Sequence, residues 1–382
     1  MTTAHKPLVI LAAGGTGGHM FPAEALSRAL RARGAEVALV TDRRGQAFGD
    51  APEVALHRIH AGRLGRSLAA RARAVLDMGL GMIEARRLLK RLAPSVVVGF
   101  GGYPSIPTVI AAAMLRVPVV LHEQNALLGR ANRRLAARAA AIATSFARVA
   151  LLPDGRAARM TGNPVRPGIL AVREWPYAAG GDGALSIFVM GGSQGAHVFS
   201  EVVPAALALL PDALKTRLSV VQQCRSEDLE DARAAFATAG VKAELAAFFT
   251  DVPDRLAACH LVIARAGAST VAELGVAGRP AILVPYPFAT DDHQTANAEA
   301  FAETGGAWVI GQRAFKPEVL AQRIEMLVSR PDILARAAAA ARAAGQPDAA
   351  ERLADLVLAQ VRAPEAAMGP FDRRRSALRE AA

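Results

Sequence analysis

A glycine cluster followed by a single histidine stands near the start of the chain, directly after an apolar run. The stretch AAGGTGGHMFPA, residues 12–23, has four glycines before His19, and Pro22 marks the expected start of a helix. A glycine loop between a buried strand and a helix lets backbone N–H groups and the helix dipole face an anion. The stretch therefore predicts an anion site with His19 as a candidate general base beside it. Alternatively, the glycines only permit tight strand–helix packing and His19 is a structural hydrogen-bonding residue.

A second glycine loop, GGSQGA over residues 191–196, follows a second apolar run. Neither loop contains the Gly-Lys-Ser/Thr of a Walker sequence, and neither fits G-x-G-x-x-G cleanly, because Met20 takes the third glycine position counted from Gly15. Asp42, after the second expected strand, is a candidate ribose-binding acid. A dinucleotide-binding domain therefore remains an alternative.

The stretch ARAGASTVAEL, residues 264–274, resembles a third ligand-binding helix start. Gly267 and Ala268 leave space, Ser269 and Thr270 offer hydroxyls to a phosphate, and Glu273 could accept hydrogen bonds from two ribose hydroxyls. The alternative is a capping box, S/T-x-x-E, in which Thr270 and Glu273 only stabilise the helix start.

Further polar residues follow in the stretch PYPFATDDHQTANAE, residues 285–299. Asp291, Asp292 and His293 could suggest metal ligands, but adjacent residues on one turn converge poorly on an ion, and aspartates commonly cap helices. Gln294 and Asn297, three residues apart, carry amides suited to the neutral hydroxyls of a sugar. We therefore expect sugar contacts here and no metal.

The first half of the chain supplies two more polar segments behind apolar runs. LHEQNALLGRANR, residues 121–133, places His122 and Glu123 at the end of a strand, where open α/β sheets bind ligands, and both are further candidate bases. GFGGYPS, residues 99–105, is another glycine-rich turn.

Strand and helix patterns alternate along the whole chain, which indicates an α/β fold with parallel sheets covered by helices. Expected strands cover residues 7–13, 36–41, 95–99, 117–121, 140–144, 185–190, 218–223, 243–247, 261–264 and 281–284. Because a strand and glycine loop open each half, we predict two Rossmann-like domains, 1–163 and 164–344, joined at TGNPVRP (161–167). A last helix at about 345–362 is expected to pack back on the first domain, and 363–382 is expected to be a basic tail.

Composition limits the class of protein. The 382 residues contain two cysteines, which suits a reducing compartment, and no apolar run is long enough for a transmembrane helix. Residues 1–163 carry 23 Lys and Arg against 9 Asp and Glu, a net charge of +14, whereas the remainder carries −3. Such asymmetry predicts that the first half faces an anionic partner.

Taken together, these stretches resemble, in order, the motifs of the MurG family of peptidoglycan glycosyltransferases. The matching segments are GGTGGHMFPA, GGYPS, LHEQNALLGRANR, TGNPVR, GGSQGA, RAGASTVAEL and DDHQTANA. The resemblance implies a two-domain GT-B fold, UDP-N-acetylglucosamine as donor and an undecaprenyl-pyrophosphoryl-N-acetylmuramoyl-pentapeptide lipid as acceptor. It also implies a peripheral enzyme on the cytoplasmic side of the inner membrane, with other cell-wall synthesis proteins as partners.

The resemblance also implies roles for individual residues. His19 is the implied base, with Glu123 as a second catalytic residue. The implied donor-binding residues are Thr16, Gly17, Gly18, Asn125, Arg166, Ser193, Phe249, Ala268, Thr270, Glu273, His293 and Gln294. The implied acceptor-binding residues are Gly14, Gly15, Tyr103 and Asn132. No cofactor and no metal are expected, so glycine-loop amides and helix N-termini would carry the charge of the departing UDP.

A membrane-bound acceptor requires a docking surface, and residues 57–92 offer one. Nine Lys and Arg stand there against two acidic residues, with Leu76, Leu80 and Ile83 at helical spacing. A basic rim around apolar side chains suits an anionic bilayer. The alternative is an amphipathic helix that packs these side chains on the sheet.

Three other functions compete with this prediction. A UDP-N-acetylglucosamine 2-epimerase of the same fold would act on the donor alone and need no basic apolar surface. A nicotinamide dehydrogenase depends on Asp42 and on imperfect glycine spacing. A nucleic-acid binder would use the positive half, but the chain has 5% aromatic residues and no recognition motif, so we expect no nucleic-acid partner.

Overall fold

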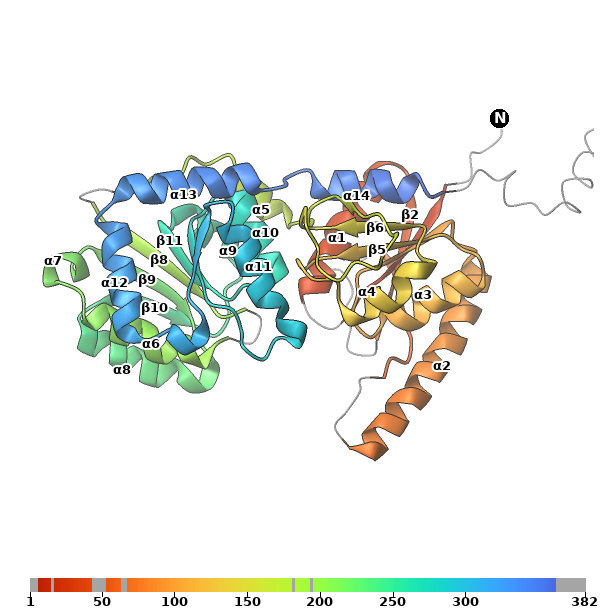
Figure 1. Cartoon of the computed structure of the whole chain (residues 1–382), viewed down its shortest axis with the longest axis horizontal. Helices are drawn as coiled ribbons and strands as arrows, with labels where there is room; N and C mark the ends of the chain where they lie inside the picture. The colour runs from red at the N-terminus through yellow and green to blue at the C-terminus, as the bar shows by residue number, and fades with distance from the viewer. Residues whose placement is uncertain are drawn as a thin grey trace, which may run out of the picture.

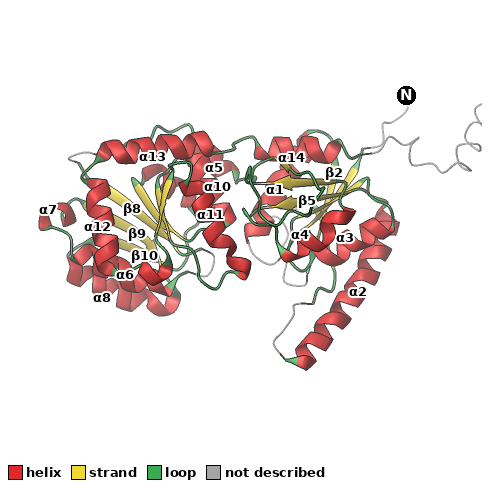
Figure 2. Ribbon diagram, viewed as in Figure 1, coloured by secondary structure: helices red, strands yellow, loops and turns green. Residues whose placement is uncertain are grey.

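The computed structural model describes residues 6–14, 17–42, 53–62, 67–180, 183–192 and 195–361, and the side chains of 68–71 are not among them. Two α/β lobes lie side by side, each a parallel sheet between layers of helices (Figures 1 and 2). We call them the N-terminal lobe, which contains β1–β7, and the C-terminal lobe, which contains β8–β13. The predicted fold class is confirmed.

The sheet of the N-terminal lobe has the strand order β3-β2-β1-β4-β5-β6-β7, and every pair is parallel. Apolar side chains cover both of its faces in two clusters, which is why its central strands read as continuous apolar runs. Its elements are β1 (Leu8–Ala12), α1 (Gly17–Ala32), β2 (Glu36–Thr41), β3 (Ala55–Arg58), α2 (Leu68–Leu92), β4 (Val96–Gly99), α3 (Ser105–Met114), β5 (Val119–Glu123), α4 (Arg130–Leu135), β6 (Ala141–Thr144) and β7 (Arg159–Met160).

The sheet of the C-terminal lobe repeats this topology as β10-β9-β8-β11-β12-β13, again parallel throughout and covered on both faces. Its elements are α5 (Pro167–Val172), β8 (Leu185–Met190), α6 (His197–Ala208), α7 (Asp212–Lys215), β9 (Leu218–Gln223), α8 (Leu229–Ala239), β10 (Lys242–Ala246), α9 (Val252–Ala258), β11 (Leu261–Ala264), α10 (Ala268–Ala277), β12 (Ala281–Leu283), α11 (His293–Ala302), β13 (Ala307–Val309), α12 (Pro317–Val328) and α13 (Pro331–Ala344).

In both sheets the chain order reverses beside the first strand, between β1 and β4 and between β8 and β11. The loops that leave these strands therefore diverge on either side and open a crevice at the carboxyl edge of the sheet. The glycine-rich stretches after β1 and β4, and those after β8 and β11, occupy these two switch points. Topology thus gives each lobe one ligand-binding edge.

The chain crosses between the lobes twice. After α13 it returns to the N-terminal lobe as α14 (Ala349–Leu358), whose Leu353 and Val357 are buried with the core on one face of the first sheet, beside α1 (Figure 1). The two connections touch, because a Cβ added to Gly162 (φ +86°) would lie 2.6 Å from the Cβ of Gln346. Both crossings therefore lie side by side, and we call this place the hinge between the lobes.

The long helix α2 extends away from the N-terminal lobe (Figure 1). Its C-terminal half packs on the sheet through Leu88 and Leu89, but Leu76, Leu80 and Ile83 are 68%, 50% and 50% exposed. The alternative that these three side chains pack on the sheet is therefore wrong. No helix in the described ranges is both long enough and apolar enough to cross a membrane.

Three short strands were not predicted, β3, β7 and β13, and the predicted helix start at Pro22 is wrong. All three strands lie at sheet edges and have two to four residues, so they lack the long apolar run of a central strand. Helix α1 begins at Gly17, five residues before Pro22, which places His19 in its first turn.

Candidate active site

His19, at the N-terminal end of α1, begins a chain of hydrogen-bonded side chains that runs through the end of β5. Its Nδ1 lies 3.2 Å from Oε1 of Gln124. The Nε2 of Gln124 lies 3.0 Å from Nδ1 of His122, and Nε2 of His122 lies 3.0 Å from the carbonyl oxygen of Gly162. The chain of contacts connects the helix start to the hinge between the lobes.

The Gly162 carbonyl fixes the direction of every proton in this chain. A carbonyl only accepts, so His122 donates from Nε2 and its Nδ1 accepts from the Gln124 amide. The oxygen of Gln124 then accepts from Nδ1–H of His19, which leaves the lone pair of a neutral His19 on Nε2. Burial lowers the pKa of His122 to about 4, so this ring stays neutral and the arrangement persists at neutral pH.

Burial also lowers the pKa of His19. The Glu123 carboxylate, the hydrogen bond that His19 donates to Gln124 and the backbone carbonyl of Phe100 oppose this shift. A neutral imidazole with its lone pair on Nε2 is the form that removes a proton from a hydroxyl. The arrangement can therefore act as a general base at neutral pH.

Glu123 lies at the centre of a separate hydrogen-bond network and is only 2% exposed. Its Oε1 accepts from the backbone N–H (3.0 Å) and side-chain amide (3.0 Å) of Asn125. Its Oε2 accepts from the N–H of Gly129 (2.8 Å) and the amide of Asn132 (2.8 Å). Four donors hold this carboxylate as an acceptor, so its geometry suits positioning of Asn125 and Asn132.

The glycine loops after β1 and β4 lie against His19 and against each other. The Cβ of any residue replacing Gly101 (φ +84°) or Gly102 (φ +74°) would lie 3.5 Å from the His19 ring, and one at Gly14 would lie 2.6 Å from Cγ of Pro104. The loops after β1 and β4 are thus packed against each other, as the shared switch point requires. Tyr103, on the second loop, is 38% exposed.

Arg166, just before α5, joins the hinge to the C-terminal lobe. Its Nε and Nη2 lie 3.0 and 2.9 Å from Oε1 of Glu273, and its guanidinium stacks 4.7 Å from the ring centroid of Phe21 on α1. Burial raises the pKa of Glu273, and Arg166 opposes that shift. The capping-box interpretation is wrong, since α10 begins at Ala268 with Gly267 as its N-cap and Thr270 lies inside the helix.

Pro22 creates one of the contacts between the lobes. A proline inside a helix has no N–H for the carbonyl four residues earlier, here that of Gly18. The hydroxyl of Ser269, at the start of α10, donates to this carbonyl oxygen at 3.4 Å. The N-terminal ends of α1 and α10 therefore face each other across the lobes.

Asn297 on α11 is fully buried and bridges the lobes. Its Oδ1 accepts from the N–H of Ala126 (2.8 Å), and its Nδ2 donates to Oδ1 of Asn125 (3.1 Å) and to the carbonyl of Ala266 (3.1 Å). The expectation that Asn297 contacts a sugar is wrong, because the side chain is fully buried and donates both hydrogens of its amide nitrogen within the protein. Gln294 accepts through Oε1 from the N–H of Tyr286 at 3.0 Å and keeps its amide nitrogen for other contacts.

Asp291 also connects the lobes. Its carboxylate accepts from Nε and Nη2 of Arg130 and from Nη2 of Arg133 at 2.7 Å, and these arginines hold its pKa below the usual range. His293, two residues further along the chain, is tied by Nδ1 to the carbonyl of Thr290 at 2.8 Å. In the described ranges no three His, Cys, Asp or Glu side chains are grouped to hold a metal ion.

The remaining predicted residues fall into three groups. Phe249 is buried against Phe188, with the guanidinium of Arg255 5.1 Å from its ring centroid, at the carboxyl edge of the second sheet. Gly17 and Gly18 form the first turn of α1, and Ala268 and Thr270 form that of α10. Gly15, Thr16 and Ser193 lie outside the described residues.

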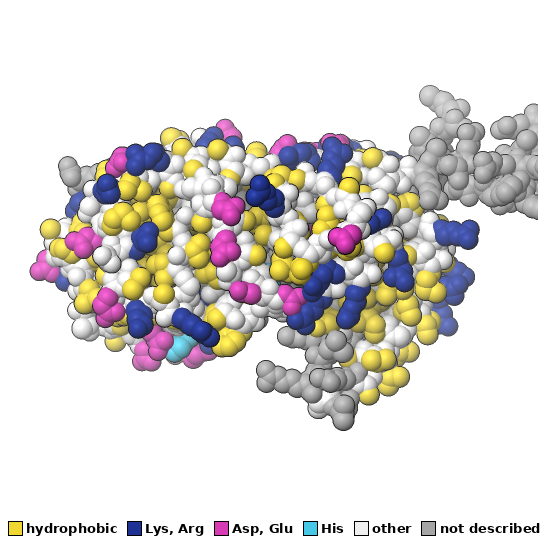
Figure 3. Space-filling model, viewed as in Figure 1, with side chains coloured by type: hydrophobic (Ala, Val, Ile, Leu, Met, Phe, Trp, Pro, Cys, Tyr) yellow, Lys and Arg dark blue, Asp and Glu magenta, His cyan; other side chains and the backbone are white. Residues whose placement is uncertain are grey.

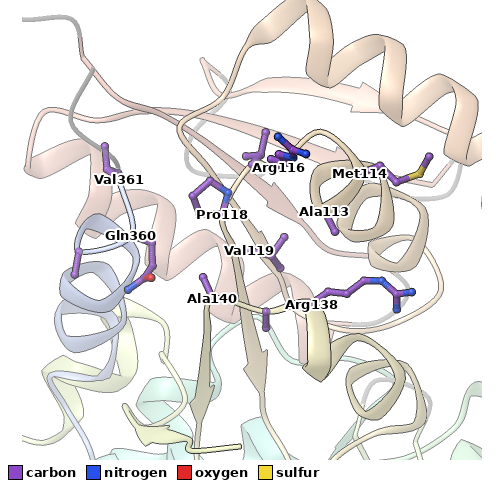
Figure 4. A pocket seen from close by; sticks show the side chains of 12 residues that line it. Ala113, Met114, Arg116, Pro118, Val119, Arg138, Ala140, Gln360 and Val361 are labelled. Atoms are coloured by element: carbon purple, nitrogen blue, oxygen red, sulfur yellow. The ribbon is translucent and has the colours of Figure 1, made fainter. Parts of the chain in front are cut away.

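A hollow of about 770 Å³ lies at the opposite edge of the N-terminal sheet, where β5 begins, between Arg116, Arg138 and Gln360 (Figure 4). It is remote from His122 and Glu123, which stand at the other end of β5. No buried side-chain N or O atom of its lining residues lacks a partner in the described chain. We assign it no part in the active site.

Sequence reasoning missed two features of the site. Gln124 sets the tautomer of His19. The sequence did point to this residue, because Gln124 directly follows a buried strand and stands between two other polar candidates, His122 and Asn125. The pairing of Asp291 with Arg130 and Arg133 had no signal, because it joins residues about 160 positions apart that only the fold brings together.

Comparisons with known proteins agree with this architecture. The glycosyltransferase family 28 N-terminal domain matches residues 9–144, and the glycosyltransferase family 28 C-terminal domain matches residues 186–353. A relative from Rhodospirillum centenum is 61% identical over 354 residues, covering 92% of this chain and 93% of the relative. One from Paramagnetospirillum magneticum is 54% identical over 361 residues, covering 93% and 97%. Both are named UDP-N-acetylglucosamine–N-acetylmuramyl-(pentapeptide) pyrophosphoryl-undecaprenol N-acetylglucosamine transferase.

Solved structures give the same picture. The crystal structure of MurG from Acinetobacter baumannii is 32% identical, with a TM-score of 0.75, and covers 92% of this chain and 99% of that one. A UDP-N-acetylglucosamine 2-epimerase from Neisseria meningitidis has a TM-score of 0.64 but 13% identity over 92% of this chain and 100% of that one, which shows the shared fold alone. The chain belongs to the MurG family of UDP-N-acetylglucosamine-dependent glycosyltransferases and has the two-lobed GT-B fold.

Proposed function

We propose that this enzyme transfers N-acetylglucosamine from UDP-N-acetylglucosamine to the 4-hydroxyl of the muramoyl sugar of undecaprenyl-pyrophosphoryl-N-acetylmuramoyl-pentapeptide, with inversion at the transferred carbon. The observation that carries the proposal is the chain from Gly162 to His19, which leaves a proton-accepting Nε2 between two glycine loops. The names of the relatives supply the substrates. The reaction serves peptidoglycan synthesis, and through it cell shape and division.

In this proposal the acceptor hydroxyl attacks the anomeric carbon of the donor sugar, and the bond to UDP breaks. Nε2 of His19 takes the hydroxyl proton, and UDP leaves as an anion. The N–H groups at the start of α10, with the Ser193 loop, stabilise the departing diphosphate. Glu123 acts as a positioning residue. Its carboxylate holds the side-chain amides of Asn125 and Asn132. In this proposal Asn125 faces the sugar nucleotide and Asn132 faces the lipid acceptor.

The proposed binding roles divide between the lobes. The C-terminal lobe (164–344) binds the donor, with uracil at the backbone of Phe249, ribose at Glu273 and Arg166 nearby, and phosphates at Ala268 and Thr270. Gln294 and His293 face the sugar, together with Thr16, Gly17 and Gly18 of the facing loop. The N-terminal lobe (1–163) binds the acceptor pyrophosphate at Gly14, Gly15, Tyr103 and Asn132.

The surface around α2 supports a peripheral membrane location. Lys and Arg gather on the N-terminal lobe around hydrophobic side chains (Figure 3). On α2 itself, four large apolar side chains are at least half exposed, those of Val75, Leu76, Leu80 and Ile83. An anionic lipid surface attracts such a rim by about 1 kcal/mol per basic group. We place the enzyme on the cytoplasmic side of the inner membrane, where its lipid acceptor and other cell-wall synthesis proteins would be met.

Incubation with radiolabelled UDP-N-acetylglucosamine tests the function. We expect label to enter the lipid fraction only when the undecaprenyl-linked acceptor is present, and we expect no loss of donor without acceptor. Conversion of the donor in the absence of lipid would contradict the proposal and support an epimerase instead.

Vesicle sedimentation tests the membrane surface. We expect binding to vesicles that contain anionic lipid, and weaker binding as salt rises, because the Debye length falls from about 10 Å at 0.1 M to 3 Å at 1 M. Leu80→Ser should weaken binding about tenfold, since inserting one leucine contributes about 1.5–3 kcal/mol. Leu209→Ser, at a 56% exposed leucine of the C-terminal lobe, is the matched control. Salt-independent binding, or equal loss in both variants, would contradict this surface.

A further inference from the structure

A cluster of three charged side chains joins the two lobes just before α11, and we call it the interlobe ion pair. Nε of Arg130 donates to both carboxylate oxygens of Asp291, at 2.9 and 3.0 Å, and Nη2 of Arg133 donates to Oδ2 at 2.7 Å. Two-pronged contacts of this kind are stronger and more directional than a single hydrogen bond. Although Arg130 is exposed, the side chain of Asp291 is only 19% exposed, so water competes for its carboxylate less than at an open surface.

The interlobe ion pair lies far from the hinge, at the other end of α11. Phe301, near the C-terminal end of α11, lies beside Gly275 and Gly345, where the second connection meets α10. A helix rises 1.5 Å per residue, so the 10 residues of α11 separate the hinge from the ion pair by about 15 Å. Helix α11 lies on the side of the C-terminal lobe that faces the N-terminal lobe (Figure 1), and Asn297 makes its uncharged contacts midway along it. The charged contact therefore has the longer lever arm about the hinge.

The backbone adopts an uncommon conformation to bring Asp291 to the other lobe. Asp291 and Asp292 both have positive φ, +55° and +54°. Residues other than glycine seldom adopt this left-handed region, and Asp and Asn tolerate it best. Such a conformation persists where contacts on all sides hold it. Here Asp292 accepts from the hydroxyl of Thr295 at 2.8 Å, within the start of α11, while Asp291 is held by α4.

The interlobe ion pair stands between residues that the proposed reaction uses on its two substrates. Asn132, proposed for the acceptor, lies between the two arginines on α4, and Gln294, proposed for the donor sugar, follows Asp291 by three residues. Tyr103, also proposed for the acceptor, lies close enough to Arg130 to add to the raised pKa that Asp291 gives this guanidinium. An arrangement in which the ion pair is made thus holds the donor side and the acceptor side together.

We infer that Asp291 is a positioning residue, whose ion pair with α4 holds the lobes closed at the end remote from the hinge and so assembles the two substrate sites. Asp291 itself touches neither the reacting atoms nor the base. The inference rests on the proposed function for the identity of the substrates, whereas the closure is a property of the protein alone.

Closure makes a specific prediction for donor binding. The apparent Kd of a ligand that needs the closed arrangement equals its intrinsic Kd divided by the closed fraction of the protein. The sugar of UDP-N-acetylglucosamine is proposed to meet both lobes, through Gln294 on one side and Asn125 on the other. UDP without the sugar is proposed to bind the C-terminal lobe. Loss of the ion pair should therefore weaken the sugar nucleotide selectively.

Calorimetric titration of the full-length protein with each of the two nucleotides measures this selectivity. Asp291→Asn removes the charge but keeps the size of the side chain and its tolerance of positive φ. We expect the Kd of UDP-N-acetylglucosamine to rise about tenfold and that of UDP to change by less than about twofold. Equal losses for both nucleotides, or no loss for either, would overturn the inference.

Variants of α4 separate the interlobe ion pair from a local effect on α11. Arg130→Ala combined with Arg133→Ala removes the same contact from the other lobe, so adding Asp291→Asn to it should cost no further affinity. Additive losses would overturn the pairing. Two matched controls should leave both Kd values unchanged: Asp292→Asn, whose carbonyl oxygen can still accept from Thr295, and Arg134→Ala, an exposed arginine of the same helix.

Small-angle X-ray scattering without ligand tests closure directly. We expect a larger radius of gyration for Asp291→Asn than for the wild type or Asp292→Asn, with Tm showing that all three are folded. The wild type should approach the Asp291→Asn value at about 1 M salt, where the Debye length is only about 3 Å. A radius of gyration that neither the substitution nor salt changes would overturn the inference. Scattering needs no substrate, so its failure is distinct from failure of the proposed function.

Discussion

His19→Ala is expected to lower kcat by about 10² or more, the usual contribution of a general base, with the Kd of UDP little changed. The reason is the direction of the proton chain: Gly162, His122 and Gln124 leave the lone pair of His19 on Nε2, and no other side chain in that chain offers one. Steady-state rates with lipid acceptor, together with UDP titration, measure the two effects separately.

The pH profile makes this prediction sharper. Because burial lowers the pKa of His19 below its ordinary 6.5, the neutral base persists somewhat below that pH, and kcat should fall only as pH drops through the lowered pKa. This acidic limb should vanish in the residual activity of His19→Ala.

Two further variants serve as controls for His19. Gln124→Leu, which cuts the chain but leaves the ring, should lower kcat less than His19→Ala and should move the acidic limb. His57→Ala, on the edge strand β3, should change neither the rate nor the limb. Near-normal turnover of His19→Ala would remove His19 from the role of base.

Glu273→Ala is expected to raise the KM for the donor about 10- to 100-fold, because hydrogen bonds to a charged group contribute about 1.5–3 kcal/mol. The structure removes the competing explanation for such a result, since α10 is capped by Gly267 and Glu273 makes no capping bond. Arg166, left without its carboxylate, has a side chain that is 29% exposed and can be hydrated. The Tm should therefore change little.

Matched variants separate ribose binding from support of Arg166. Glu273→Gln keeps the shape and weakens the contact with Arg166, so a KM between those of the wild type and Glu273→Ala is expected. Glu299→Ala, on an exposed position of α11, should leave the KM unchanged. A Glu273→Ala protein with a lower Tm and an unaltered donor KM would show that Glu273 is only structural.

Local sequence patterns were sufficient for the architecture. Ten strands were predicted close to their observed positions, four of them with the observed bounds, because central strands of a doubly covered sheet are continuous apolar runs. The edge strands β3, β7 and β13 were missed because a short strand with one neighbour has no such run. Pro22 misled the prediction because proline favours a first turn, whereas here Ser269 of the other lobe occupies the carbonyl that it leaves free.

The amino-acid sequence alone determined the α/β class, the duplicated strand–glycine-loop pattern and the residues able to do chemistry, since each depends on neighbours in the chain. Only the tertiary structure decided what those residues do to one another. The proton position on His19 depends on a carbonyl of Gly162 and the partner of Glu273 lies 107 residues away. Asp291 is held by two arginines of the other lobe. Such pairings arise when sheets and helices bring distant segments together, and no local pattern records them.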